Sequence, residues 1–234
     1  MKFGAIIPVF NEETRIGGVL ARFAPGLLSE IVVVDDGSTD GTTALLKTFP
    51  VTVIRHDERK GVGCAIREGL ELLAAKGCDA AVVMAGNGKD DPAEIPKLIA
   101  PVAAGEADYV QGSRFLDGGS FNNLPLARYL MIKSFTVMWM ALIGRSLTDV
   151  TNGFRCYRLA LLKDPNIRIG QDWLDKYELE YYLHYKALTS GYKFKEVAVS
   201  KNYPSKTNYS KIRPILDWWG IVKPVLLLRF RLRA

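Results

Sequence analysis

Short apolar segments rich in β-branched residues alternate with helix-like segments over the first two-thirds of the chain, and this alternation restricts the fold more than any other feature. The expected strands cover residues 3–9, 31–35, 51–55, 80–84 and 109–111. The helices expected between them cover residues 12–23, 42–48, 62–76 and 92–103. Because the strands are continuous apolar runs, we expect both of their faces to be buried. The sequence therefore predicts the α/β class, with a mostly parallel sheet and helices on both faces.

The pattern changes after residue 111. A loop rich in Gly and Asn, residues 117–124, precedes a long amphipathic helix expected over residues 126–143. A second helix over residues 174–189 and a last strand over residues 193–199 follow. A connection of this length exceeds an ordinary turn, so we expect it to cover the carboxyl edge of the sheet.

Length and composition fit one folded domain. The chain has 234 residues, of which 48% are hydrophobic, so a packed core is possible and two cores of ordinary size are not expected. The three cysteines have no Cys-x-x-Cys spacing, which predicts neither a disulfide framework nor a zinc site and indicates a reducing compartment. We assign the domain to residues 1–211 and a basic amphipathic tail to residues 212–234.

The positive charge is concentrated near the C-terminal end. The net charge is +6, and residues 206–234 contain seven Lys or Arg and a single acidic residue, Asp217, which accounts for the whole excess. Because Trp218, Trp219 and an apolar run over residues 224–228 accompany these cations, the tail is typical of an arm that binds an anionic membrane surface. A solvated basic helix end is the alternative.

The sequence shows no signal-peptide pattern and no membrane-spanning stretch, which agrees with the reducing compartment that the cysteines indicate. The chain begins without a signal-peptide pattern. Its longest uncharged apolar stretch, between Lys133 and Arg145, is shorter than the ~20 residues that a transmembrane helix needs. We therefore expect a cytoplasmic protein that is peripheral to the cytoplasmic face of the membrane and does not span it.

Polar residues follow three of the expected strands where the strands end. Residues 8–12 read Pro-Val-Phe-Asn-Glu, residues 34–38 read Val-Asp-Asp-Gly-Ser, and residues 84–92 end in Asp-Asp-Pro. In open α/β sheets, ligands bind outside the carboxyl ends of the strands. Carboxylates there can accept hydrogen bonds from a nucleobase and a ribose, and a helix amino end can face a phosphate. Each motif alone is also typical of a capped helix start.

Six motifs in this order resemble a known family. They are AIIPVFNEE, EIVVVDDGSTDGT, RKGVGCAIREGL, the Asp-Asp-Pro ending, YVQGSRF and DVTNGFR. Together they are similar to the family 2 inverting glycosyltransferases of the GT-A fold, and most of all to the dolichol- and polyprenyl-phosphate sugar (mannosyl or glucosyl) synthases. The likeness covers about residues 3–211. It implies transfer of a sugar from a GDP- or UDP-sugar to a polyprenyl or dolichyl phosphate, or to a similar lipid-linked acceptor.

The resemblance implies a donor site built by several loops. The residues that would hold the base and ribose of the nucleotide-sugar are Pro8, Phe10, Glu12, Asp35 and Asp36. The turn at Gly61 and Gly63 would let the backbone approach the nucleotide, and close helix–sheet packing is the alternative reading. Further donor-side residues implied by the likeness are Asn87, Lys89, Asp91 and, in a basic loop near the end, Lys206 and Lys211.

The same resemblance implies an acceptor side. Arg114 looks like the family's phosphate or acceptor-side arginine, and a surface salt bridge is the alternative. Asp149 and Arg155 mirror the family's Asp…Gly-Phe-Arg segment, and a buried ion pair would explain both as well. The positions that would grip the acceptor phosphate on the long helix are Arg128, Lys133 and Ser134. The carboxylate that faces the acceptor pocket corresponds to Glu178 or Glu180.

The ending of the fourth strand departs from the family. Its members carry Asp-X-Asp there, whose carboxylates hold Mg²⁺ or Mn²⁺ against the diphosphate, whereas this chain has Ala85, Gly86 and Asn87, followed by Lys89. Because hard divalent cations prefer charged oxygen ligands, this substitution puts metal binding in doubt. Three readings stay open: Lys89 replaces the cation, Asn87 and Asp90 hold a weaker metal together with donor oxygens, or the protein binds without turnover.

The implied reaction is displacement at the anomeric carbon with inversion and departure of the nucleoside diphosphate. A phosphate acceptor is already anionic, whereas a saccharide hydroxyl requires a base such as Glu178 or Glu180. A non-catalytic nucleotide-sugar- or lipid-binding module is the alternative. Nucleic acid is not an expected partner, because basic and aromatic residues do not interleave over a broad face. The sequence does not indicate an oligomeric state.

Overall fold

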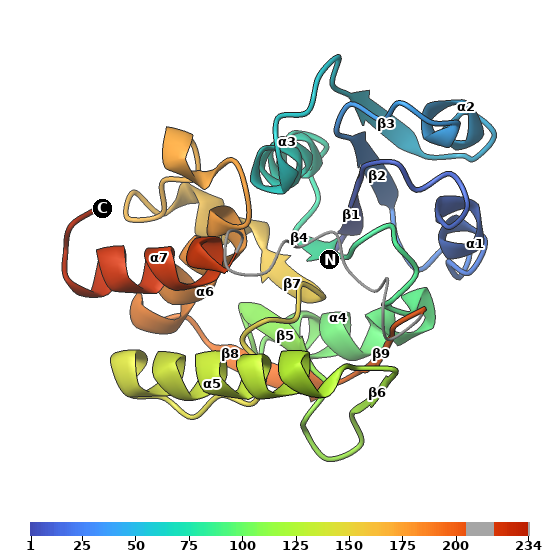
Figure 1. Cartoon of the computed structure of the whole chain (residues 1–234). Coiled ribbons are helices and arrows are strands. Elements are labelled where there is room, and N and C mark those ends of the chain that lie inside the picture. The colour runs from blue at the N-terminus through green and yellow to red at the C-terminus, as the bar shows by residue number, and fades with distance from the viewer. Residues whose placement is uncertain (205–217, 234) are drawn as a thin grey trace.

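A computed structural model of the chain describes residues 1–204 and 218–233 (Figure 1). Its main sheet has seven strands in the order β3-β2-β1-β4-β7-β5-β8. Every neighbouring pair is parallel except the two that β7 forms with β4 and β5. The strands are β1 (Phe3–Val9), β2 (Glu30–Asp35), β3 (Thr52–Arg55), β4 (Ala80–Val83), β5 (Tyr109–Ser113), β7 (Arg155–Arg158) and β8 (Phe194–Ala198).

Helices cover both faces of this sheet, which confirms the α/β class. Alternate residues of each strand point to opposite faces, so Ile6 packs with α3 (Val62–Ala75) and α6 (Glu178–Thr189). Its neighbour Ile7 packs on the other face, with α1 (Ile16–Leu20), α2 (Thr42–Leu46) and α4 (Ile95–Ala103). Short 3-10 helices cover Pro92–Glu94, Leu159–Lys163 and Asp172–Leu174.

Within the main sheet and the helices beside it, the largest differences from the predicted elements lie at three places. The helix expected over residues 12–23 is helical only over Ile16–Leu20, and the helix expected from residue 174 begins at Glu178. Strand β7 was not predicted, because its four residues, Arg-Cys-Tyr-Arg, are charged at both ends and form no apolar run. The pairing of β7 between two parallel neighbours buries Cys156 and Tyr157 and makes the sheet mixed.

The end of the chain adds a third group of helices. Helix α7 (Trp219–Arg229) lies beside α6, and α5 (Leu126–Ile143) packs against both (Figure 1). Trp139, Ile221 and Val225 are buried where the three helices meet. Residues 219–229, which we expected to belong to a basic tail, are therefore packed on the domain. The expected boundary between residues 211 and 212 lies outside the described residues.

Helix α5 is the one helix in the described part of the chain that is long and apolar enough to cross a membrane by length and composition. The sequence criterion missed it because Lys133 interrupts the uncharged stretch. Its inner side packs on the core through Ile132, Thr136 and Trp139, whereas Leu126, Leu130 and Val137 are exposed. Strand β6 (Ser120–Asn122), in the loop before α5, pairs with β9 (Ser200–Asn202), which follows β8, and the two form a small parallel sheet.

Candidate functional site

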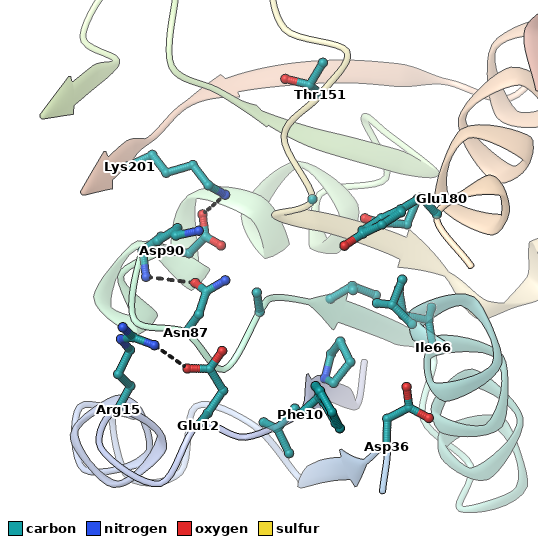
Figure 2. A pocket seen from close by; sticks show the side chains of 18 of the residues that line it. Phe10, Glu12, Arg15, Asp36, Ile66, Asn87, Asp90, Thr151, Glu180 and Lys201 are labelled. Atoms are coloured by element: carbon teal, nitrogen blue, oxygen red, sulfur yellow. Dashed lines mark hydrogen bonds and ion pairs between the residues drawn. The ribbon is translucent and has the colours of Figure 1, made fainter. Parts of the chain in front are cut away.

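A cleft of about 360 Å³ opens at the carboxyl ends of β1 and β4 (Figure 2). This is the edge at which the sequence placed its polar motifs. The predicted site residues that line the cleft are Pro8, Phe10, Glu12, Asp36, Asn87, Lys89, Asp90, Arg128 and Glu180. The motifs that follow β1, β2 and β4 thus meet at one site, because parallel strands bring their carboxyl ends to the same edge. Arg128 reaches the cleft from α5 and Glu180 from α6.

One end of the cleft combines an aromatic ring with a fixed carboxylate. The guanidinium of Arg59 lies 4.4 Å from the centre of the Phe10 ring. Asp36 accepts hydrogen bonds from the backbone N–H groups of Lys60 and Gly61, at 2.7 Å and 3.0–3.1 Å, and contacts His56 Nδ1 at 2.8 Å. A planar apolar surface beside a rigid acceptor is suited to a nucleobase and its ribose.

Asp35 lies outside the cleft lining. Its buried carboxylate accepts hydrogen bonds from the Ser38 N–H at 2.9 Å, from the Thr43 hydroxyl and from Arg55 at 2.9 Å. Asp35 therefore fixes the turn that follows β2, and in this structure Asp36 is the member of the pair that faces the cleft.

The two glycines of the 61–63 turn make room for another part of the protein. A Cβ atom on Gly61 would lie 2.3 Å from the carbonyl oxygen of Asp175, and one on Gly63 would lie 2.1 Å from that of Leu174. Neither glycine lines the cleft. The close approach that these glycines permit is thus to residues 174–176, and not to the sheet or to the cleft.

The middle of the cleft carries both signs of charge. Arg15 donates a hydrogen bond to Glu12 at 3.0 Å, and Lys201 donates one to Asp90 at 2.6 Å. Burial, reinforced by the nearby charges of Lys201 and Arg128, lowers the pKa of Lys89 to about 7. Lys89 is thus a buried cation with two other cations nearby.

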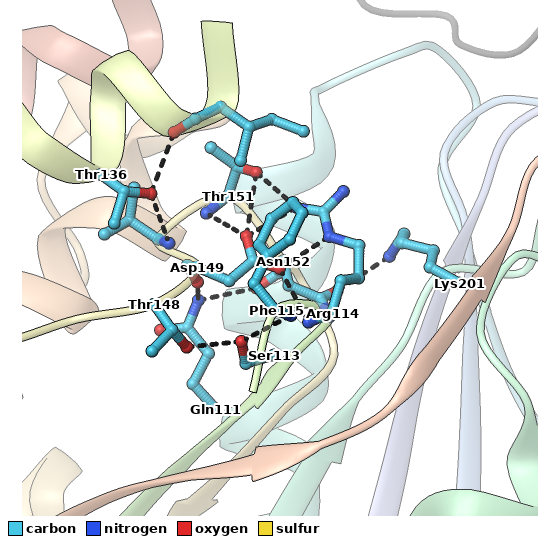
Figure 3. A network of polar contacts seen from close by, with 12 residues as sticks. Gln111, Ser113, Arg114, Phe115, Thr136, Thr148, Asp149, Thr151, Asn152 and Lys201 are labelled. Carbon is cyan, nitrogen blue, oxygen red and sulfur yellow. Dashed lines mark hydrogen bonds and ion pairs between the residues drawn. The ribbon is translucent and has the colours of Figure 1, made fainter. Parts of the chain in front are cut away.

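Arg114 and Asp149 form a buried ion pair behind the cleft (Figure 3). Two guanidinium nitrogens of Arg114 donate to the two carboxylate oxygens of Asp149, both at 2.6 Å, and Arg114 also donates to Thr151 and Tyr203 at 2.6 Å. Burial opposes the charge of Asp149, but Arg114 outweighs burial and lowers the pKa of that carboxyl. The surface salt bridge considered for Arg114 is therefore wrong, because both partners are interior.

Arg155 has different partners from those considered. It donates to the carbonyl oxygens of Asn152, Glu180 and Val150 at 2.8, 2.6 and 3.1 Å. The reading of Asp149 and Arg155 as one ion pair is thus wrong, since Asp149 pairs with Arg114. Arg155 ties the 150–152 turn to α6.

The two candidate glutamates lie in different surroundings. Glu180 lines the cleft, where burial raises the pKa of its carboxyl and Arg155 offsets that effect only in part. Glu178 lies outside the cleft lining, 3.7 Å from the ammonium of Lys223 on α7. Successive positions on a helix point about 100° apart, so only one of two residues spaced by two can face the cleft.

The three residues expected to bind the acceptor phosphate do not lie together at the cleft. Arg128, in the first turn of α5, lines the cleft. The ammonium of Lys133 lies 3.7 Å from the centre of the Phe115 ring, and the exposed Ser134 hydroxyl donates to the Leu130 carbonyl oxygen at 2.9 Å. In this structure, Arg128 alone of the three is at the cleft.

The remaining donor-side predictions do not reach the cleft or are not described. Asp91 accepts from the Ala93 N–H at 3.0 Å and caps the 3-10 helix Pro92–Glu94. Its carboxylate also lies 3.6 Å from Arg22. Lys206 and Lys211 lie outside the described residues.

Sequence reasoning missed seven polar residues of the cleft lining, namely Arg15, Arg59, Thr151, Tyr177, Tyr181, Lys201 and Tyr203. Lys201 comes from β9, far along the chain from Asp90, and no local pattern distinguishes it from the neighbouring lysines. Arg15 and Thr151 stand beside predicted motifs, at Asn-Glu-Glu and at Asp-Val-Thr-Asn, so their positions in the sequence were a usable signal.

Comparisons with known proteins place these residues in a family. The sequence profile of glycosyl transferase family 2 matches residues 5–164. Polyprenol monophosphomannose synthase of Mycolicibacterium smegmatis is 30% identical over 230 residues, which cover 92% of this chain and 86% of the relative. A UDP-N-acetylglucosamine–dolichyl-phosphate N-acetylglucosaminyltransferase of Methanococcus voltae is 31% identical over 175 residues, 68% of this chain and 70% of the relative.

A solved structure shares the fold. Glucosyl-3-phosphoglycerate synthase from Mycobacterium tuberculosis, crystallised with Mg²⁺ and uridine diphosphate, superimposes with a TM-score of 0.70. The alignment covers 97% of this chain and 79% of that chain at 20% sequence identity. At this identity the likeness establishes the architecture alone.

The buried ion pair predicts a large loss of stability when one partner is neutralised. Asp149→Asn leaves the Arg114 charge in the interior without its carboxylate, so we expect the free energy of unfolding to fall by about 3–5 kcal/mol. Urea denaturation followed by circular dichroism measures this change. Glu106→Gln is the control, because it removes an exposed ion pair with Lys195 and is expected to change little. Equal effects of the two substitutions would contradict a buried pair.

Proposed function

The chain belongs to glycosyl transferase family 2, and from that premise we propose that it transfers a sugar from a GDP- or UDP-sugar to a polyprenyl or dolichyl phosphate, with inversion. The observation that carries this proposal is the convergence of Phe10, Asp36, Lys89 and Arg128 on one cleft at the carboxyl edge. The similarity to the polyprenol monophosphomannose synthase of M. smegmatis and to the dolichyl-phosphate N-acetylglucosaminyltransferase of M. voltae supports a lipid-phosphate acceptor.

The polarity of the cleft supports one orientation of the donor. The Phe10 ring and the Asp36 carboxylate suit the base and ribose, while Lys89 and Lys201 suit the negatively charged diphosphate. Glu180 and Arg128 line the rest of the cleft, where the sugar and the acceptor would meet. The donor would then extend from the end of β1 toward α5 and α6.

The reaction needs positioning and charge stabilisation more than proton transfer. An oxygen of the acceptor phosphate forms a bond to the anomeric carbon as the bond from that carbon to the diphosphate breaks, and the electron pair of the broken bond leaves with the diphosphate. The acceptor oxygen is already anionic and has no proton to lose. The cations of the cleft would stabilise the charge that develops on the leaving diphosphate.

A saccharide hydroxyl is the second candidate acceptor, and the position of Glu180 favours it. A hydroxyl must lose its proton as it attacks, and a half-buried carboxylate with a raised pKa is a suitable general base. Glu180 is the carboxylate of α6 that lines the cleft. The two acceptors therefore differ in whether they need the carboxylate of Glu180.

We also propose that the protein works at the surface of a membrane, peripheral to its cytoplasmic face. Leu126, Leu130 and Val137 are 71%, 55% and 64% exposed, and their spacing places them on one side of α5. The first turn of this helix carries Arg128 into the cleft. The exposed Phe230 and Leu232 alternate with basic residues at the end of the chain, a composition that suits anionic headgroups.

Replacement of one glutamate distinguishes the two acceptors. For transfer to a phosphate, Glu180→Gln should keep the rate within about tenfold of the wild type, because no base is needed. For transfer to a hydroxyl, it should lower the rate by about 10²- to 10⁴-fold. The measurement is transfer of radiolabelled sugar from GDP- and UDP-sugars to a short polyprenyl phosphate and, separately, to a saccharide.

Glu178→Gln is the matched control, since it removes the same charge from the same helix outside the cleft lining. It should leave transfer to either acceptor nearly unchanged. If no lipid-linked product forms with any of these donors and the saccharide is glycosylated instead, the lipid-phosphate proposal is wrong.

A charge on the exposed side of α5 should weaken membrane binding. Val137→Glu places a carboxylate where the proposal puts lipid, so a smaller fraction of the protein should float with vesicles of phosphatidylglycerol and phosphatidylcholine. Ala75→Glu adds the same charge to the exposed end of α3 and serves as the control. Equal flotation of the two variants would argue against α5 as the membrane-facing surface.

A further inference from the structure

The positions after β4 at which the family carries Asp-X-Asp do not provide the charged oxygen ligands that a divalent cation prefers. Ala85 has no side-chain oxygen, and Asn87 offers only a neutral amide. Within residues 1–204 and 218–233, one group of three His, Cys, Asp or Glu side chains has its ligand atoms within 4.8 Å of one another. That group is not part of the cleft lining and consists of His56, Cys64 and Glu68.

The carboxylate best placed after β4 already has a cation. The ammonium of Lys201 lies 2.6 Å from Asp90 Oδ1 (Figure 2) and 2.9 Å from Asn152 Oδ1 (Figure 3). The Lys201 and Asp90 side chains are 12% and 1% exposed, so water screens this pair poorly. A divalent ion on the second oxygen of Asp90 would share the carboxylate with this ammonium, and the repulsion would be strong in such a site. The residues present therefore do not fit Mg²⁺ or Mn²⁺.

Lys89 adds positive charge to the same part of the cleft. Its ammonium lies 5.6 Å from the centre of the Tyr203 ring, and Tyr203 is itself hydrogen-bonded to Arg114. Among the residues that the structure describes, Lys89 forms no ion pair. Burial, together with the nearby charges of Lys201 and Arg128, lowers the pKa of Lys89, and an anion bound there would favour its ammonium form by offsetting the three cations.

The whole cleft lining carries more basic than acidic side chains. Five basic side chains, Arg15, Arg59, Lys89, Arg128 and Lys201, face four acidic ones, Glu12, Asp36, Asp90 and Glu180. Two of the acidic residues, Glu12 and Asp90, accept hydrogen bonds from cations of the lining. An anionic ligand would offset this positive excess, and a dication would make the excess larger.

We propose that Lys89 and Lys201 bind the diphosphate of the donor in place of a divalent cation, so that donor binding and sugar transfer need no metal. This inference rests on the proposed function. When the bond between the anomeric carbon and the diphosphate oxygen breaks, the electron pair passes to the diphosphate. Lys89 and Lys201, each in its ammonium form, stabilise the added charge as hydrogen-bond donors and transfer no proton.

Calorimetric titration of the full chain with GDP and with UDP tests the inference, in buffer containing EDTA and in buffer containing Mn²⁺. We expect one of the two nucleotides to bind in EDTA with a dissociation constant within about threefold of its value in Mn²⁺. In EDTA, Lys89→Met should weaken that binding by about tenfold or more, because a charge-assisted hydrogen bond to phosphate is lost. The corresponding nucleoside monophosphate should lose less affinity, since the missing ammonium contacts the diphosphate.

The variants are chosen so that folding does not obscure the result. Lys89→Met breaks no ion pair of the described residues, whereas Lys201→Met leaves Asp90 unpaired and is used as the second variant, with its melting temperature measured. Lys195→Met is the matched control, because it neutralises an exposed lysine on β8 and should leave nucleotide binding unchanged.

The outcomes separate this inference from the proposed function. Binding that occurs in Mn²⁺ and disappears in EDTA overturns metal-independent donor binding and leaves the glycosyltransferase proposal intact. Metal-independent binding that Lys89→Met weakens no more than Lys195→Met does overturns the role of Lys89. If neither nucleotide binds under either condition, the proposed donor is wrong, and the inference falls with it.

Discussion

The buried ion pair between Arg114 and Asp149 connects the scaffold to the cleft. Arg114 follows the end of β5, and Asp149 stands in the long connection that returns through α5. Removal of two charges from water is costly unless each is fully paired. Here Arg114 satisfies both oxygens of Asp149 and also holds Thr151 and Tyr203, two residues of the cleft lining. The position of the cleft wall thus depends on the geometry of this one pair.

A parallel sheet gives the cleft its place, and the charges around it give the cleft its chemistry. The ends of β1 and β4 supply Phe10, Glu12 and Asn87, while Lys201 arrives from β9 and Glu180 from α6. In a partly desolvated cleft, fixed cations interact with phosphate more strongly than they do in bulk water. Lys201, from the second half of the chain, thus adds positive charge to a cleft that begins at strand ends of the first half.

The sequence predicted the fold well and the site in part, and the reasons differ. Strand-like runs and periodic helices are local patterns, so six of the seven main strands and α5 follow from them. The family motifs located the edge of the sheet, but motif membership does not say which way a side chain points. Asp35 accepts a hydrogen bond from the Ser38 N–H in the turn after β2, and Gly63 makes room for the backbone at Leu174. Lys201 depends on tertiary pairing alone, which no sequence window contains.

The central claim is that the cleft at the ends of β1 and β4 is the donor site of a glycosyltransferase. A crystal structure of the chain with a bound nucleoside diphosphate tests this claim most directly. The account predicts the base beside Phe10 and Asp36, with the diphosphate within hydrogen-bond distance of Lys89 or Lys201. A nucleotide bound on another face of the molecule, with the cleft filled only by solvent, would contradict it.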